Sequence, residues 1–238
     1  MTVPLSEQLG VGGHELISIV GAGGKSTVLL ALGRELAGAG GRVILTTTTK
    51  MARDQVTERS CWSADPVAVE EHLMKGSPLF VALRAVPDKV TGPTPEGVDR
   101  LFSDTTAAFV VVEADGARSM LVKAPADHEP MIPNRSTLVV VVAAMTAVGR
   151  SIAEVSHRPE RVATLAGVGE DHVLSVPDLA SVLLHPKGGL KGIPDTARVA
   201  VAVTRVSKKS EPIAANLTEL LLAHPRVDRA IALRSADS

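Results

Sequence analysis

The chain has 238 residues, which is enough to bury a full hydrophobic core. Hydrophobic residues make up 45% of the sequence and charged residues 21%, a balance that excludes the composition of a disordered chain. The formal net charge of -1, with lysines and arginines scattered along the chain, argues against a nucleic-acid partner. With no leader segment, no apolar run of membrane-spanning length and one cysteine, we expect a single cytoplasmic domain over residues 1–238 with no membrane partner.

The N-terminal part of the chain predicts a strand, a helix and a second strand. Residues 15–20 are mostly apolar, and residues 26–37 place leucines on one face of a helix. Glycines end this helix, and residues 42–47 form the next apolar strand. Elements in this order form a right-handed crossover between two parallel strands.

The alternation of strands and helices continues to the end of the chain. Further helices, several of which begin with a proline, are expected at residues 66–74, 95–102, 159–165, 177–184 and 212–222. Further strands are expected at residues 79–83, 108–113, 137–144, 197–203 and 230–233. We predict a loop at residues 86–95 and a long polar connection at residues 114–136. A loop of that length inside a compact domain is usually functional.

The strongest motif lies between the first strand and the first helix. It consists of Gly21, Ala22, Gly23, Gly24, Lys25, Ser26 and Thr27. Glycines allow backbone N–H groups to face an anion, the lysine can reach terminal phosphates, and the serine hydroxyl can bind Mg²⁺. The alternative is a glycine-rich turn with an exposed lysine. We favour a phosphate-binding loop that holds ATP or GTP with Mg²⁺.

The spacing of this motif is shorter than that of an ordinary phosphate loop. Only Ala22 and Gly23 separate the first glycine from the Gly-Lys pair. Loops of this short form resemble those of the Mur ligases and folylpolyglutamate synthases, which hold ATP. The motif and the element order together predict an α/β fold of P-loop NTPase type, with three layers and a mostly parallel sheet covered by helices on both faces.

Two carboxylates follow the strand at residues 108–113. Glu113 and Asp115 stand at its carboxyl end, where open α/β sheets bind ligands. An acidic residue on a strand beside the phosphate loop can hold Mg²⁺, so Ser26, Glu113 and Asp115 are the candidate metal ligands. Together with Lys25, the two carboxylates are also the candidate catalytic residues. The alternative is a solvated strand end followed by an Asp-Gly turn.

Other polar residues fall at the same predicted edge of the sheet. Thr48 and Lys50 continue the second strand toward the phosphate loop, although a threonine run is also typical of an edge strand. Candidate substrate residues in the later loops are Lys123, His128, Glu129, His157, Arg158 and Lys191. For the first five of these residues, a purely structural role in a rigid surface loop and a capped helix is as good an interpretation as substrate binding. For Lys191 a solvated loop is favoured over substrate binding. Cys61 has no neighbour that would activate it, and we expect it to be inert.

Several of these motifs, in the same order, resemble the YqeC family. The resemblance is carried by residues 20–27, Thr46 to Met51, residues 112–117, Lys123-Ala124-Pro125, His128-Glu129-Pro130 and His157-Arg158-Pro159-Glu160. It extends from about residue 17 to residue 192. It implies an accessory protein in the maturation of selenium-dependent molybdenum hydroxylases, whose molybdenum cofactor carries a labile selenium ligand. The implied partners are a nucleotide and a molybdenum hydroxylase or its cofactor.

Three functions are compatible with these features. The first is a Mg²⁺-dependent NTPase or nucleotide-dependent transferase. The second is a nucleotide-gated chaperone or cofactor-insertion factor with little catalysis of its own. The third, an amide-forming ligase like the Mur enzymes, is weakened because the chain lacks the length for their added domains.

The C-terminal part departs from the family pattern. Many relatives have Asn-Lys-Val-Asp after the penultimate strand, and this chain has Thr204-Arg205-Val206-Ser207. Because an Asn-Lys-x-Asp tetrad can read guanine, its replacement removes the argument for GTP specificity. The sequence after Leu233 is short, and the resemblance leads us to expect a longer final segment.

Overall fold

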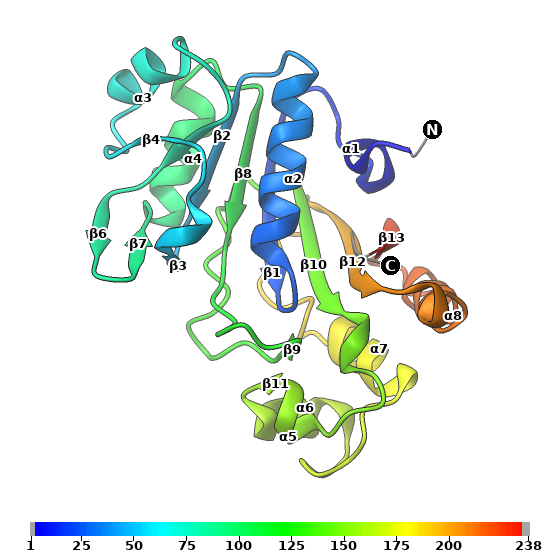
Figure 1. Ribbon diagram of the computed structural model, residues 1–238. Helices are drawn as coiled ribbons and strands as arrows, with labels where there is room; N and C mark the ends of the chain where they lie inside the picture. The colour runs from blue at the N-terminus through cyan, green and yellow to red at the C-terminus, as the bar shows by residue number, and fades with distance from the viewer. Residues whose placement is uncertain (1–2, 235–238) are drawn as a thin grey trace.

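A computed structural model describes residues 3–234 of the chain and has a twisted central sheet at its core (Figure 1). The sheet has eight strands in the order β13-β12-β10-β1-β8-β2-β5-β4, and all neighbouring strands pair in parallel. Its strands are β1 (Glu15–Gly21), β2 (Val43–Thr47), β4 (Arg59–Cys61), β5 (Leu79–Val81), β8 (Phe109–Glu113), β10 (Leu138–Ala144), β12 (Arg198–Val206) and β13 (Arg229–Arg234). Valine-rich runs buried on both faces are typical of such parallel strands.

Helices cover both faces of this sheet. They are α1 (Leu5–Leu9), α2 (Lys25–Gly38), α3 (Pro66–Leu73), α4 (Pro95–Asp104), α5 (Ile152–Val155), α6 (Pro159–Ala166), α7 (Val176–Leu184) and α8 (Glu211–Leu222). One face packs against α1 and α2. On the other face, α3 and α4 cover β2, β5 and β8, while α7 and α8 pack with β10 and β12. The helices α5 and α6 lie beyond the end of the sheet, where α6 contacts α7 (Figure 1). Within residues 3–234, no helix combines the length and the apolar character needed to cross a membrane.

The predicted order of the main elements is confirmed, with ends shifted by a few residues. The expectation that Thr48 and Lys50 continue the second strand was wrong, because the chain bends after Thr47 and Lys50 begins a strand of a separate sheet. The structure adds short elements that the sequence pattern did not indicate. They are α1, α5, β3 (Lys50–Ala52), β4, β6 (Arg84–Val86), β7 (Lys89–Thr91), β9 (Val122–Lys123) and β11 (Ser156–His157). The prediction of a loop at residues 86–95 was wrong because β6 and β7 form an antiparallel hairpin that also pairs with β3. Two or three residues are too few to show a strand period.

The position of β1 creates the crevice in which a site can form. After β1, the chain crosses to β2 on one side, and after β8 it crosses to β10 on the other side. Because the connections that follow the neighbouring strands β1 and β8 run in opposite directions, a crevice opens at the carboxyl ends of these strands, which is where open α/β sheets bind ligands. The loop before α2 therefore lies at the reversal point of the strand order.

The β6–β7 hairpin is fastened to the end of β2 at Gly92. A Cβ atom placed on Gly92 would lie 1.7 Å from the backbone oxygen of Thr47. Since no side chain fits in that space, the hairpin backbone approaches the sheet edge directly. This contact brings Lys89 and Thr91 to the same crevice as the loop before α2.

Candidate functional site

The loop between β1 and α2 has the backbone geometry of an anion-binding turn. Gly21, Gly23 and Gly24 have φ angles of 97°, 81° and 142°, a region that L-residues rarely adopt. A Cβ atom on Gly23 would lie 2.6 Å from the Cβ of Ala144, so the loop has no room for a larger residue. Gly24 is the N-cap of α2, and no side chain of the described residues caps the helix. The first-turn N–H groups are therefore available to a ligand.

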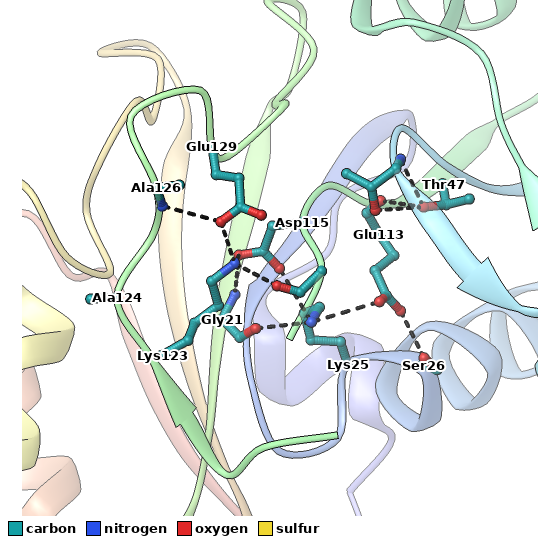
Figure 2. Close-up of polar contacts among 12 residues, drawn as sticks. Gly21, Lys25, Ser26, Thr47, Glu113, Asp115, Lys123, Ala124, Ala126 and Glu129 are labelled. Atoms are coloured by element: carbon teal, nitrogen blue, oxygen red, sulfur yellow. Dashed lines mark hydrogen bonds and ion pairs between the residues drawn. The ribbon is translucent and has the colours of Figure 1, made fainter. Parts of the chain in front are cut away.

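Lys25 is buried among acceptors at the start of α2. Its side chain is only 4% exposed, and Nζ donates a hydrogen bond to the Gly21 oxygen at 2.9 Å. The same ammonium lies 3.2 Å from Oδ1 of Asp115 and 3.6 Å from Oε1 of Glu113 (Figure 2). Both carboxylates compensate the cost of burying this positive charge.

Ser26 and Glu113 meet because β8 lies beside β1. Glu113 pairs in register with Ile19, two residues before the loop, and Ser26 Oγ donates to Glu113 Oε2 at 2.7 Å. Burial raises the pKa of Glu113, while the charge of Lys25 and the hydrogen bond from Ser26 oppose this shift. A hydroxyl and a carboxylate at this position are the protein ligands typical of a nucleotide-bound Mg²⁺.

Asp115 is shared between two lysines. Its Oδ2 accepts a hydrogen bond from the Gly21 N–H at 3.0 Å and lies 3.0 Å from Lys123 Nζ. Its Oδ1 faces Lys25 at 3.2 Å but has no hydrogen-bond partner among residues 3–234. Figure 2 shows the carboxylate between the loop and the segment that follows β9. Asp115 therefore links the loop geometry to that segment.

Lys123 and Glu129 form the outer part of this charged network. The Lys123 side chain is 2% exposed, and its ammonium donates to Gly116 O at 2.6 Å and to Glu129 Oε2 at 3.0 Å. Arg158 Nη1 also donates to Glu129 Oε2, at 2.9 Å. Burial alone would raise the pKa of Glu129, but Lys123, the Ala126 N–H and Arg158 outweigh it and lower the pKa to about 2.

A large cavity opens on the loop and on several of the predicted residues. Its volume is about 720 Å³, and among its lining residues are Gly23, Gly24, Lys25, Ser26, Thr27, Thr48, Lys50, Glu113, His128, Glu129, His157 and Arg158. The remaining predicted residues, Gly21, Ala22, Asp115, Lys123 and Lys191, do not line it. Lys191 instead donates to the backbone oxygens of Ala126 and Asp127. The structure thus separates residues that face the cavity from residues that support its wall.

Other lining residues were not singled out from the sequence as site residues. They include Gln55, Lys89, Arg118 and Arg205. Gln55 Oε1 accepts from Ser26 Oγ at 3.2 Å, and Arg118 and Arg205 have φ angles of 48° and 54°. Gln55 lies in a 3-10 turn, Lys89 in the three-residue strand β7, Arg118 in a loop and Arg205 near the end of β12, and isolated polar residues such as these carry no spacing signal that would have found them. Their side chains reach the cavity only through the tertiary fold.

Thr204 was noted as a departure from a base-reading tetrad, and the structure places it against the phosphate-loop motif. Its Oγ1 donates to the Gly23 oxygen at 2.6 Å, and its Cγ2 would lie 3.3 Å from a Cβ placed on Gly24. The end of β12 therefore supports the loop from the side opposite to β8. Thr204, which stands where the relatives have the first residue of the base-reading tetrad, therefore supports the backbone of the loop in this chain.

Two comparisons with known proteins identify relatives of this chain. The family model described as YqeC protein matches residues 17–160. Uncharacterized protein YqeC of Escherichia coli (strain K12) is 36% identical over 203 residues, which cover 84% of this chain and 79% of that protein. The chain belongs to the YqeC family. The match contains the loop, both carboxylates, Lys123, Glu129, His157 and Arg158.

A solved structure supports the fold class. The MinC:MinD cell division protein complex of Aquifex aeolicus contains a chain that matches with a TM-score of 0.50 and 13% sequence identity. The match covers 92% of this chain and 80% of that chain. At this identity the likeness concerns the fold alone. It supports the expected P-loop NTPase-like architecture, a three-layer α/β fold with a mostly parallel sheet.

Proposed function

We propose that this protein binds a nucleoside triphosphate with Mg²⁺ at the loop Gly21 to Thr27 and hydrolyses it or transfers part of it. The observation that carries the proposal is the contact between Ser26 and Glu113 beside Lys25, at the mouth of an uncapped helix. These groups lie on two separate segments of chain, the start of α2 and the end of β8, and the parallel pairing of β1 with β8 brings them together. The 720 Å³ cavity provides room for a nucleotide and a second molecule.

The residues of the loop and of the segments beside it have different proposed roles. The N–H groups at the start of α2 would donate to phosphate oxygens, and Lys25 would exchange its carboxylate contacts for a terminal phosphate. Ser26 and Glu113 would hold Mg²⁺, which when bound neutralises phosphate charge. Asp115 would fix the Gly21 N–H and restrain Lys25, because its oxygens are already engaged with these groups. Thr48 and Lys50 would contact the nucleotide or the second substrate.

The donor set fits Mg²⁺. Among residues 3–234, no three His, Cys, Asp or Glu side chains gather in a cluster that could hold a metal ion. Mg²⁺ commonly uses one or two protein ligands and completes its shell with water and phosphate oxygens. Ser26 and Glu113 are sufficient for that arrangement. These two ligands do not distinguish ATP from GTP, because the two nucleotides differ only in the base.

The experiment compares Lys25→Ala with Lys75→Ala, a change at an exposed lysine that precedes β5. Binding of fluorescent ATP and GTP analogues and phosphate release are measured with and without Mg²⁺. We expect Lys25→Ala to reduce turnover by a factor on the order of 10² to 10³, the usual effect of removing one group that stabilises transition-state charge. Circular dichroism checks the fold. Equal binding and turnover in the two variants would rule out the proposed site.

We further propose that the nucleotide cycle serves the maturation of molybdenum hydroxylases that carry selenium. This rests on the family resemblance of the motifs and not on a residue that recognises selenium. The test mixes the purified protein with a molybdenum hydroxylase lacking its selenium ligand. Complex formation that requires ATP or GTP, with little turnover by the protein alone, would favour a gated insertion factor. Turnover without the hydroxylase would favour an enzyme, and no association in any nucleotide state would exclude the maturation role.

A further inference from the structure

A second, smaller cavity adjoins the large one on the side of β11. Its volume is about 360 Å³, and it is lined by Arg118, Met120, Ser156, His157 and Arg158. All of these except Ser156 also line the 720 Å³ cavity, so the two spaces share a wall. None of the lining residues of the smaller cavity belongs to the loop that is proposed to hold the nucleotide.

The shared wall presents donors that are not used within the protein. Arg158 Nη1 donates hydrogen bonds to Glu129 and to the Ala124 oxygen, and within residues 3–234 its Nε and Nη2 make no hydrogen bond. Arg118 is exposed and forms no ion pair with any described residue. Two guanidinium groups at one cavity give it a strong preference for an anion. Each planar guanidinium can donate two parallel hydrogen bonds to the oxygens of a phosphate or carboxylate.

Two buried polar atoms beside these arginines lack partners. Ser156 is 3% exposed, and neither its Oγ nor the Nδ1 of His157 has a hydrogen bond within the described part of the chain. Buried polar atoms are nearly always hydrogen-bonded, so groups without a protein partner usually serve a ligand or an ordered water. They are adjacent in sequence on β11, and both residues line the smaller cavity.

Three of the four charged groups near His157 are positive. Burial and then the charges of Arg158 and Lys123 lower the pKa of His157 to about 4, with a smaller contribution from Arg118 and an opposing one from Glu129. His157 is therefore neutral near pH 7 and can donate a hydrogen bond without carrying charge. The positive charges of Arg158, Lys123 and Arg118, which add to the effect of burial on this pKa, would also stabilise a bound anion.

We propose that the cavity formed by Arg118, Ser156, His157 and Arg158 binds a phosphoryl group of a second substrate. The inference rests on the proposed function, because the phosphoryl group would lie across the shared wall from the nucleotide. It assigns the chemical class of the molecule on which the nucleotide acts. Arg118 and Arg158 supply charge, and Ser156 and His157 supply hydrogen bonds.

The test titrates inorganic phosphate into protein saturated with Mg²⁺ and the nonhydrolysable analogue AMPPNP. Calorimetry measures affinity, and NMR of the His157 imidazole reports occupancy, because a bound dianion raises the pKa of His157. We compare Arg118→Gln with Arg100→Gln, an exposed arginine on α4. Loss of a charged hydrogen bond should weaken phosphate binding about 10- to 100-fold in Arg118→Gln and leave it unchanged in Arg100→Gln.

Other outcomes would overturn the assignment. If AMPPNP excludes phosphate, the arginines serve the terminal phosphate of the nucleotide and no separate subsite exists. If phosphate does not bind, or binds equally to both variants, the cavity does not select a phosphoryl group. Failure of AMPPNP to bind would count against the nucleotide function alone. The titration is then repeated without nucleotide, and the same pair of variants decides about the cavity.

Discussion

Two buried lysines lie on either side of Asp115, and their surroundings differ in one respect. Lys25 and Lys123 are each less than 5% exposed, and each contacts a backbone oxygen and two carboxylates. Lys25 lines the large cavity, whereas Lys123 does not. The same side-chain chemistry therefore gives a group that can exchange its partners for a ligand and a group that holds the wall. Access to the cavity separates a binding role from a structural one.

The largest expected difference is in stability. Lys123→Met removes a buried cation from both Asp115 and Glu129, which keep only Lys25 and Arg158 as cationic partners, and breaking such a buried pair costs about 3–5 kcal/mol. Lys25→Met should cost less, because Glu113 can take up a proton and Asp115 keeps Lys123. Denaturant unfolding of both variants measures the difference. If Lys25→Met proves the more destabilising, the division between wall and ligand group is wrong.

The second prediction concerns the carboxylate on the ligand side. Glu113→Gln keeps the shape of the side chain and removes its charge, so we expect Mg²⁺ affinity in the nucleotide complex to fall about 10- to 100-fold. Titration of Mg²⁺ against the fluorescence of a bound nucleotide analogue measures the effect. Glu170→Gln, at an exposed residue outside the cavity lining, is the matched control. Unchanged Mg²⁺ affinity would remove Glu113 from the metal site.

The same variant tests the effect of burial on Glu113. Because burial raises its pKa above 4.5, the folded state binds the proton more tightly than the unfolded state does. Ionisation of Glu113 therefore lowers the free energy of unfolding as pH rises above this value. Without Mg²⁺ at neutral pH, we expect Glu113→Gln to be more stable than the parent protein. A destabilised variant would contradict this sign.

Glu129, which lines the cavity and pairs with Lys123 and Arg158, should behave in the opposite way. Glu129 has a pKa of about 2 in the folded state, below its ordinary value of 4.5. Its contribution to stability is fully present above pH 4.5 and is lost as pH falls from 4.5 to 2. Unfolding of Glu129→Gln across this range should show a weaker pH dependence than that of the parent protein. Parallel curves for the two proteins would show that Glu129 does not hold the wall.

The smallest expected effect is at His157. Its pKa of about 4 lies below 6.5, so the unfolded state binds more protons in this interval and stability falls as pH decreases from 6.5 to 4. The charges facing it are those of Arg118, Lys123, Glu129 and Arg158. We expect His157→Gln to lose this slope in denaturant unfolding and His14→Gln, an exposed control, to keep it. An unchanged slope in His157→Gln would show that burial and the neighbouring positive charges do not lower the pKa of this imidazole.

The main strands and helices could be predicted because each is long and strongly patterned. The apolar runs in β8 and β10 and the leucines of α2 show their periods within the sequence. The loop at Gly21 and the carboxylate at Glu113 were also identifiable, since strand ends in a parallel sheet converge on one edge. Their predicted roles remain to be tested.

The supporting wall could not be derived in the same way. Lys123 and Arg158 are 35 residues apart in the chain, and they meet only because the short strands β9 and β11 pair. The sequence pattern indicated both as substrate candidates, but it could not distinguish a buried ammonium whose donors are all used within the protein from a guanidinium that faces a cavity. That distinction depends on packing between segments whose two-residue strands carry no period.

The contact at Gly92 limits how this protein can vary or be redesigned. Because an added methyl group there would collide with the Thr47 oxygen, the hairpin could tolerate a different residue only by detaching from β2. Lys89 and Thr91 would then leave the crevice together with it. Grafting a foreign loop between β5 and α4 should therefore succeed only when a glycine is kept at this position, whatever else in the hairpin is exchanged.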